Sequence, residues 1–281
     1  MRQDDAIRND QGFALVLVLW ALLLLTVLGA GLLVETRVTR MVAATSSVRL
    51  KAQLIADGAI NRAVMAVLDP RDPLHLPLDG ASQVVGFLGH SVELATESEA
   101  GKISLNAASP DLFAKLFRGV GVAPDDAASL AARIVAWRTS PSESDRADIV
   151  RQYHEAERTY VPRFGLFRST GELRLVLGMT DALQSAVAPL VTVWSESGDI
   201  DRSVARPEVL QILKAAGDDL AESQLEARKK GQAAGIDRPV RKDEVVTITA
   251  NLEMDGLAVS RVAVIQIAGD PHEPYRVLAW N

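Results

Sequence analysis

The stretch FALVLVLWALLLLTVLGAGLLV, residues 13–34, decides how the rest of the chain is organised. It contains no charged side chain, and a helix that crosses a bilayer needs about 20 apolar residues. A cleaved secretory signal usually has only about 7–15 apolar residues, and no small-residue cleavage site is evident after this stretch. A core helix that is apolar on every side is rarely needed at an N-terminus. We therefore expect a retained membrane anchor.

A short polar segment, residues 1–12, ends in Gln11-Gly12 directly before Phe13. This order of polar leader, glycine, phenylalanine and long apolar helix resembles the class III leader of type IV pilins and type II secretion pseudopilins. The resemblance implies that a prepilin peptidase cuts between Gly12 and Phe13 and methylates the new amine of Phe13. It also implies a single pass through the bacterial inner membrane, with the N-terminus cytoplasmic and the C-terminal domain periplasmic.

The charges that flank the apolar stretch favour the opposite orientation. The leader carries Arg2 and Arg8 among three aspartates, and four basic residues follow the stretch: Arg37, Arg40, Arg49 and Lys51. A simple positive-inside count would keep the C-terminal side in the cytoplasm. The rule is weak for long translocated domains, so we keep the orientation that the leader implies.

Leu17 occupies the fifth position counted from Phe13, where most pilins carry a glutamate. A carboxylate inside a bilayer is costly unless it is paired. In the family this glutamate is thought to pair with the N-terminal amine of a neighbouring subunit, and a subunit with no neighbour beyond it has no use for the charge. The member that characteristically lacks the glutamate is the minor pseudopilin protein K, which sits at the tip. The chain thus resembles the protein K family.

The N-terminal helix is expected to continue to Leu68. Small and apolar residues recur at spacings of three and four along one face: Val48, Ala52, Ile55, Ala59, Ala63 and Ala66. Asp69-Pro70 should end the helix, because a proline disfavours helix in the residue before it. Residues 51–68, KAQLIADGAINRAVMAVL, resemble the soluble half of the pseudopilin spine helix.

Strands are expected on both sides of a long helical block. Their predicted ranges are 84–87, 91–94, 245–252, 257–268 and 275–280. Asp255-Gly256 is a hairpin turn signal. Two passages, GKISLN at 101–106 and YRVLAW at 275–280, are similar to passages of the protein K family. The prediction is an α+β fold, with the N-terminal helix packed on an antiparallel sheet as in pilins and a large helical insertion.

The chain should therefore divide into five segments. These are a leader (1–12), the transmembrane part of the helix (13–34), the first part of a pilin-like domain (35–106), a helical insertion (107–242) and the C-terminal strands (243–281). Residues 198–213 echo 101–116, which suggests that a helical hairpin occurs twice in the insertion. Ser169 and Glu172 form a capping-box pattern, Gly178 should end that helix and Thr180 should cap the next. Residues 217–242 are expected to form a mobile loop or a frayed helix.

The first predicted hairpin has helix-hairpin-helix character. Ser109-Pro110-Asp111 begins one helix, Gly119-Val120-Gly121 ends it, and a second begins near Pro124. In DNA-binding versions, backbone N–H groups of the hairpin hold a phosphate with the help of nearby basic residues. Here Asp125 and Asp126 lie at a helix start, and the net charge of the chain is −6. A compact helical pair is therefore favoured over a DNA-binding one.

The segment 140–162 is polar and is expected to be a loop. In the protein K family, acidic calcium ligands often occur in this region, so Asp145, Asp148 and Glu155 are the candidates for calcium. Calcium needs six to eight oxygen ligands from a folded loop, and no EF-hand spacing is present. A solvated charged loop is the favoured interpretation, and calcium is the alternative.

Composition supports a folded, non-catalytic protein. The chain has 281 residues, 48% of them hydrophobic, which favours a packed core over disorder. It has no cysteine, so a disulfide framework, a thiolate metal site and a cysteine nucleophile are all excluded. The four histidines show no ligand spacing, and no common catalytic motif is present. We expect no enzyme activity.

The predicted function is that of a minor pseudopilin of type II secretion, which caps the periplasmic pseudopilus during export of folded proteins. The resemblance implies that it binds minor pseudopilins I and J, the prepilin peptidase and the inner-membrane secretion platform, and also secreted substrates or the outer-membrane secretin. Two alternatives stay open. One is a minor pilin of a type IV pilus or competence system, and the other is a membrane-anchored DNA-binding protein that uses the helical hairpins.

Overall fold

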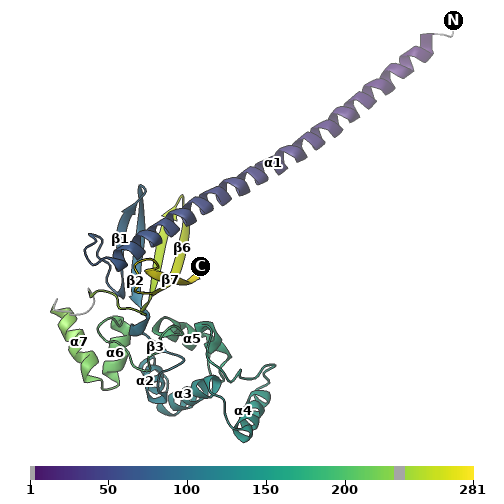
Figure 1. The fold of residues 1–281 in the computed structure, drawn as a ribbon. Helices are drawn as coiled ribbons and strands as arrows, with labels where there is room; N and C mark the ends of the chain where they lie inside the picture. The colour runs from purple at the N-terminus through teal and green to yellow at the C-terminus, as the bar shows by residue number, and fades with distance from the viewer. Residues whose placement is uncertain (1–3, 231–237) are drawn as a thin grey trace.

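The computed structural model describes residues 4–230 and 238–281, with side chains described for 14–26, 46–230 and 238–281. One long helix, a five-stranded sheet and a group of shorter helices make up the fold (Figure 1). The group of shorter helices lies at the end of the molecule away from the N-terminus (Figure 1). The α+β class and the antiparallel sheet are as the sequence predicts.

Helix α1 (Asp4–Leu68) contains 65 residues and is continuous. It ends at Leu68, as predicted, directly before Asp69-Pro70, where proline cannot continue the helix. Its N-terminal part projects away from the rest of the molecule (Figure 1). In the part of the chain whose side chains are described, no helix is long and apolar enough to cross a membrane.

The sheet has the strand order β1-β2-β5-β6-β7, and every neighbouring pair is antiparallel. Its strands are β1 (Asp79–Phe87), β2 (His90–Ser98), β5 (Val245–Met254), β6 (Leu257–Ile267) and β7 (Tyr275–Trp280). The predicted Asp255-Gly256 turn joins β5 to β6, with φ values of 52° and 76°. Two consecutive residues with positive φ match the twist of a tight hairpin. The chain leaves the sheet after β2 and returns beside it at β5.

The second half of α1 packs on one face of the sheet. Four alanines of α1 are buried there: Ala52, Ala56, Ala59 and Ala63. The facing side of β5 buries Val246, Ile248, Ala250 and Leu252, in the period of two that a half-buried strand requires. Small side chains allow the helix to approach the sheet closely. Gly58 serves the same purpose, because a Cβ there would lie 2.8 Å from the ring of Phe87.

The insertion between β2 and β5 is mainly helical. Its elements are η1 (Glu99–Gly101), β3 (Ile103–Ser104), α2 (Pro110–Gly119), α3 (Pro124–Arg138), α4 (Glu143–Glu155), η2 (Thr170–Leu175), α5 (Asp181–Val187), η3 (Ala188–Leu190), β4 (Val191–Thr192), α6 (Pro207–Ala215) and α7 (Asp219–Lys229). Strands β3 and β4 form a short parallel pair. The helices enclose a second apolar core around Phe113, Phe117 and Trp137.

Three local predictions differ from the structure. Residues 219–229, expected to be part of a mobile loop or frayed helix, form the regular helix α7, whose first turn is capped by the Asp218 carboxylate. The supposed loop 140–162 contains a regular helix, α4, whose first turn is capped by the Ser142 hydroxyl, which accepts from the Asp145 N–H. Its sequence is so polar that it has little apolar periodicity, and only Tyr153 is buried. The capping box at Ser169 does not form, because that hydroxyl makes no capping bond and the segment is a 3₁₀ helix. Thr180 does cap α5, as predicted.

Candidate functional site

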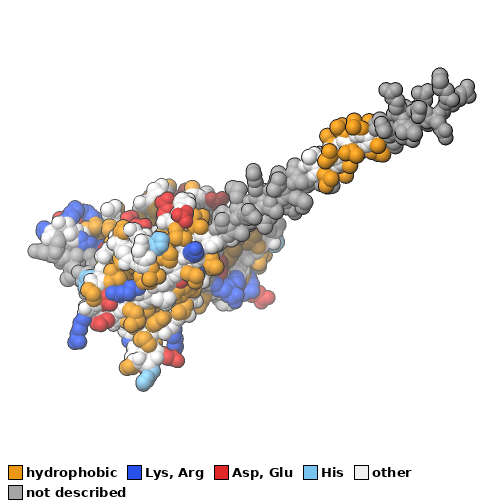
Figure 2. All heavy atoms as spheres, turned by 90° about the horizontal axis from the view of Figure 1, so that it is seen from above, with side chains coloured by type: hydrophobic (Ala, Val, Ile, Leu, Met, Phe, Trp, Pro, Cys, Tyr) orange, Lys and Arg blue, Asp and Glu red, His pale blue; other side chains and the backbone are white. Residues whose placement is uncertain are grey.

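The N-terminal part of α1 exposes large apolar side chains on all sides. From Leu15 to Leu25 every large apolar residue is more than half exposed, including Leu17 at 56%. Figure 2 shows this stretch as an apolar band on the projecting helix. Such a surface is unstable in water and indicates burial in lipid or against other helices. The side chains of Gly12 and Phe13, the predicted cleavage residues, lie outside those described.

The second half of α1 also keeps an apolar line on its solvent side. Leu50, Leu54 and Met65 are each more than half exposed, although the opposite side of the helix is buried on the sheet. Their spacings of four and eleven residues place them on one face. They form a strip, here called the spine strip, in which the exposed polar Asn61 lies between Leu54 and Met65. A strip of this kind suits packing against a second helix.

The repeat predicted from the sequence is visible in the insertion. Helices α2 and α6 begin at Pro110 and Pro207, which occupy equivalent places in the two copies, and each is followed by a partner helix, α3 or α7. The two copies contact each other reciprocally. A Cβ at Gly101 would lie 2.7 Å from the Val204 carbonyl, and one at Gly198 would lie 2.9 Å from the Ala107 carbonyl. Only glycine permits either approach.

In the first hairpin, the N–H groups of the turn are not free to bind a phosphate. The N–H groups of Gly121 and Val122 donate to carbonyls of α2, at 3.0 and 2.9 Å. Arg133 donates to the Leu177 carbonyl, and Arg138 donates to those of Leu105 and Ala108. Burial lowers the pKa of Arg138. The groups that a DNA-binding hairpin would use serve the fold instead.

The three calcium candidates lie on α4 rather than on a loop. Asp145 accepts a hydrogen bond from the Ser142 hydroxyl, while Arg151 pairs with Asp148 at 2.9 Å and reaches Glu155 at 3.7 Å. Within the described residues, no group of three or more His, Cys, Asp or Glu is arranged to hold a metal ion. Three carboxylates spread along one exposed helix, two of them facing an arginine, do not fit calcium, which needs six to eight oxygens.

The GKISLN passage links the sheet to the insertion. Lys102 lies between Glu97 and Glu99, with Nζ–oxygen distances of 3.0 and 2.7 Å. Burial opposes its charge, but the two carboxylates more than offset this and raise the pKa of Lys102. Asn106 both donates to and accepts from the backbone of Phe167. Polar residues of this passage therefore bind the end of β2 on one side and the Phe167 backbone of the insertion on the other.

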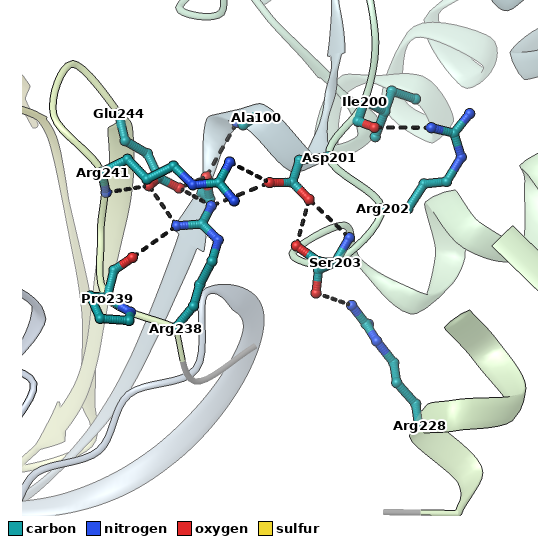
Figure 3. A network of polar contacts seen from close by, with 11 residues as sticks. Ala100, Ile200, Asp201, Arg202, Ser203, Arg228, Arg238, Pro239, Arg241 and Glu244 are labelled. Carbon is teal, nitrogen blue, oxygen red and sulfur yellow. Dashed lines mark hydrogen bonds and ion pairs between the residues drawn. The ribbon is translucent and has the colours of Figure 1, made fainter. Parts of the chain in front are cut away.

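Ion pairs surround the place where the insertion meets the sheet. We call this set the junction: Asp79, Glu97, Asp201, Arg206, Arg228, Arg238, Arg241 and Glu244. Figure 3 shows Arg238 and Arg241 pointing toward Asp201, with Glu244 beside Arg238. The junction is not predictable from the sequence, because its partners are far apart in the chain. The only sequence signal was the charge of each residue.

Comparison with known proteins agrees with the sequence resemblance. Residues 92–196 match the family model for type II secretion system protein K. The resemblance to type II secretion system protein K is confirmed. The part matched to protein K begins in β2, includes the GKISLN passage and the first hairpin, and ends just after β4. No curated protein matches the sequence significantly.

A solved structure has a similar fold. One chain of "The Crystal Structure of the GspK-GspI-GspJ complex from enterotoxigenic Escherichia coli Type 2 Secretion System" matches with a TM-score of 0.59 and 13% identity. The match covers 86% of the present chain and 98% of that chain. At this identity the likeness shows a shared α+β fold. The similarity therefore extends well beyond the range that matches the protein K family model.

Proposed function

We propose that this chain is a minor pseudopilin of the type II secretion system, which assembles through its long helix and caps the tip of the periplasmic pseudopilus. One observation carries the proposal. Helix α1 packs on the sheet with its second half, yet it exposes apolar side chains along the N-terminal part and along the spine strip. A subunit with this surface is stable when other helices or lipid cover it. The protein K match supports this particular assembly.

We further propose that residues 13–34 cross the inner membrane after a prepilin peptidase removes residues 1–12. The peptidase would then methylate the amine of Phe13. The remaining chain would lie in the periplasm, as a pilin-like domain (35–106 and 243–281) that carries the insertion (107–242). The projecting apolar part of α1 supports this arrangement.

The proposed place at the tip rests on two features. Leu17 has no carboxylate to pair with the amine of a subunit beyond it, so the chain is suited to be an end member. The insertion lies at the end of the molecule away from the N-terminus (Figure 1), where it would obstruct the addition of another subunit. The matched crystal structure is of a complex that contains GspI and GspJ. We propose that pseudopilins of those two types cover the spine strip.

The test is the processing of the full chain in its native membrane. Mass spectrometry should find a mature N-terminus at methylated Phe13, and Gly12→Val should leave residues 1–12 attached. A matched control, Gly31→Val, changes another glycine of the N-terminal region and should be processed normally. An unprocessed parent chain, or cleavage before Phe13 in Gly12→Val, would contradict the proposal.

A further inference from the structure

The insertion and the sheet have separate apolar cores. Within the described residues, the buried apolar cluster around Phe113 and the cluster around Ile248 share no member. From the described part of the insertion, 107–230, a single buried apolar residue, Val204, belongs to the sheet cluster. Apolar packing across the boundary is therefore small, and little hydrophobic free energy holds the two parts together.

Close backbone contact occurs at one point of this boundary. The carbonyl of Val204 lies against Gly101 of η1, where a Cβ would be only 2.7 Å away. Although η1 lies between β2 and β5 in the chain, it belongs to the sheet side of this boundary, because Glu99 accepts a hydrogen bond from the Thr247 hydroxyl of β5. Next to it, the Asp201 N–H donates to the Ala100 carbonyl at 2.8 Å. The insertion thus touches the sheet side through a small area around residues 100–101 and 201–205, which is the geometry of a pivot.

Charged pairs make the remaining contacts across the junction. Arg206 binds both oxygens of Glu97, with one distance of 2.9 Å, and its guanidinium passes over Gly80. Arg228 of α7 reaches Asp79 of β1 at 3.4 Å. These two pairs place acidic groups on the sheet and basic groups on the insertion.

A third set of pairs has the opposite polarity. Asp201 faces Arg238 at 3.4 Å and Arg241 at 3.3 Å (Figure 3). Both arginines lie within the proposed range 107–242, but they are counted here with the sheet side, because they belong to the short segment that leads directly into β5. Arg238 also binds Glu244 at 2.7 Å, and Glu244 accepts from the Ser98 hydroxyl. The junction is therefore matched in charge on both sides, and each side is itself a polar surface.

Such a boundary differs in its energetics from an apolar one. Desolvation offsets much of the Coulomb attraction of a buried ion pair, but a carboxylate left buried without its partner is costly, so docking depends on complete pairs. Both surfaces are charged and would be well hydrated if they separated. Polar boundaries of limited area between domains allow relative motion, whereas large apolar ones do not.

We propose that the junction is a polar pivot, at which the helical insertion docks on the sheet through ion pairs and reorients as a body when those pairs are exchanged for water. Each core stays folded during this motion. In the assembly proposed above, partner helices and the membrane would hold α1 and the sheet, so the motion would displace the helical body at the far end. The proposal of a pivot rests on the contacts of the junction alone and does not depend on the proposed role in secretion.

The experiment measures a distance across the junction in the full chain. The protein has no cysteine, so Ser129→Cys in α3 and Ser260→Cys in β6 accept two spin labels at exposed sites and nowhere else. At low salt, pulsed electron resonance should give one main distance. At about 1 M NaCl, where the Debye length is about 3 Å, the share of a second, longer distance should rise about tenfold.

Variants test the named pairs. Arg206→Met with Arg228→Met should give the longer distance already at low salt, also by about tenfold, while Arg151→Met, a control in the exposed pair of α4, should not. Hydrogen exchange must show that amides near Phe113 and Ile248 stay protected. A distance that is unchanged by salt and by the double variant would overturn the pivot. The pivot would also be overturned if the longer distance appeared only when amides in both cores lost their protection from exchange. If the double variant does not fold, the salt titration of the labelled parent protein provides the test.

Discussion

Asp57 of α1 accepts a hydrogen bond from Arg261 of β6, at 2.8 Å between Oδ1 and Nε. The same carboxylate accepts from the indole N–H of Trp280 in β7 at 2.9 Å. The two strands thus hold one residue of the long helix from two directions. These hydrogen bonds add a polar restraint to the rotation of α1 that the buried alanines already set, and they keep the spine strip on the exposed side.

Replacement of Asp57 by asparagine should therefore destabilise the helix–sheet contact. Hydrogen bonds to charged groups contribute about 1.5–3 kcal/mol, and the lower end applies because both partners are about a quarter exposed. Thermal unfolding of the purified full chain should show the loss. Glu253→Gln, an exposed change on β5, is the matched control. Equal stability of the two variants would contradict this role.

Gly198→Ala should destabilise the insertion. The added methyl group would meet the Ala107 carbonyl at 2.9 Å, and a backbone carbonyl of the other copy of the repeat cannot move without shifting α2. Overpacking of this kind costs about 1–3 kcal/mol. Denaturant unfolding measures it. Gly86→Ala is the control, since nothing lies within 4 Å of its added Cβ. If the Gly198→Ala protein were as stable as this control, the close contact between Gly198 and the Ala107 carbonyl would be refuted.

Stability should fall in acid partly through Glu244. Burial opposes the charge of this carboxyl, but hydrogen bonds from Arg238 and Ser98 more than offset it and hold its pKa below the ordinary 4.5. A lowered pKa stabilises the fold above about pH 4.5, and this stabilisation is lost as pH falls through the lower folded value. Unfolding measured from pH 7 to pH 3 should show a shallower decline for Glu244→Gln. An unchanged slope would show that the group does not contribute.

Leu54→Glu should weaken the binding of partner helices to α1. Leu54 is 61% exposed in the middle of the spine strip, and a charge there cannot be buried against another apolar helix. Burying an unpaired carboxylate costs at least a few kcal/mol, so co-purification of pseudopilins I and J should fall at least about tenfold. Leu220→Glu on α7 changes an equally exposed leucine, 66% accessible, away from the strip. Equal losses in both variants would exclude the strip as the binding surface.

Local signals in the sequence predicted much of the fold. Pro110 begins α2, and Asp255-Gly256 forms a hairpin turn, because these residues restrict the backbone themselves. Helix α4 was missed since its stability comes from capping and from a few contacts, not from an apolar stripe. The junction could not be predicted, because Arg206 and Glu97 are 109 residues apart. The periodicity of apolar residues indicates which face of one helix or strand is buried. It does not indicate which charged residues of different elements form ion pairs.

The strands that border the insertion have a practical consequence. Ser98 of β2 and Val246 of β5 are register partners, so the chain departs from the sheet and re-enters it at neighbouring points. An insertion whose two ends already lie side by side does not require the strands that flank it to separate. A change in the length of the helical part is therefore compatible with the same helix and sheet, provided that the contacts of the junction are kept.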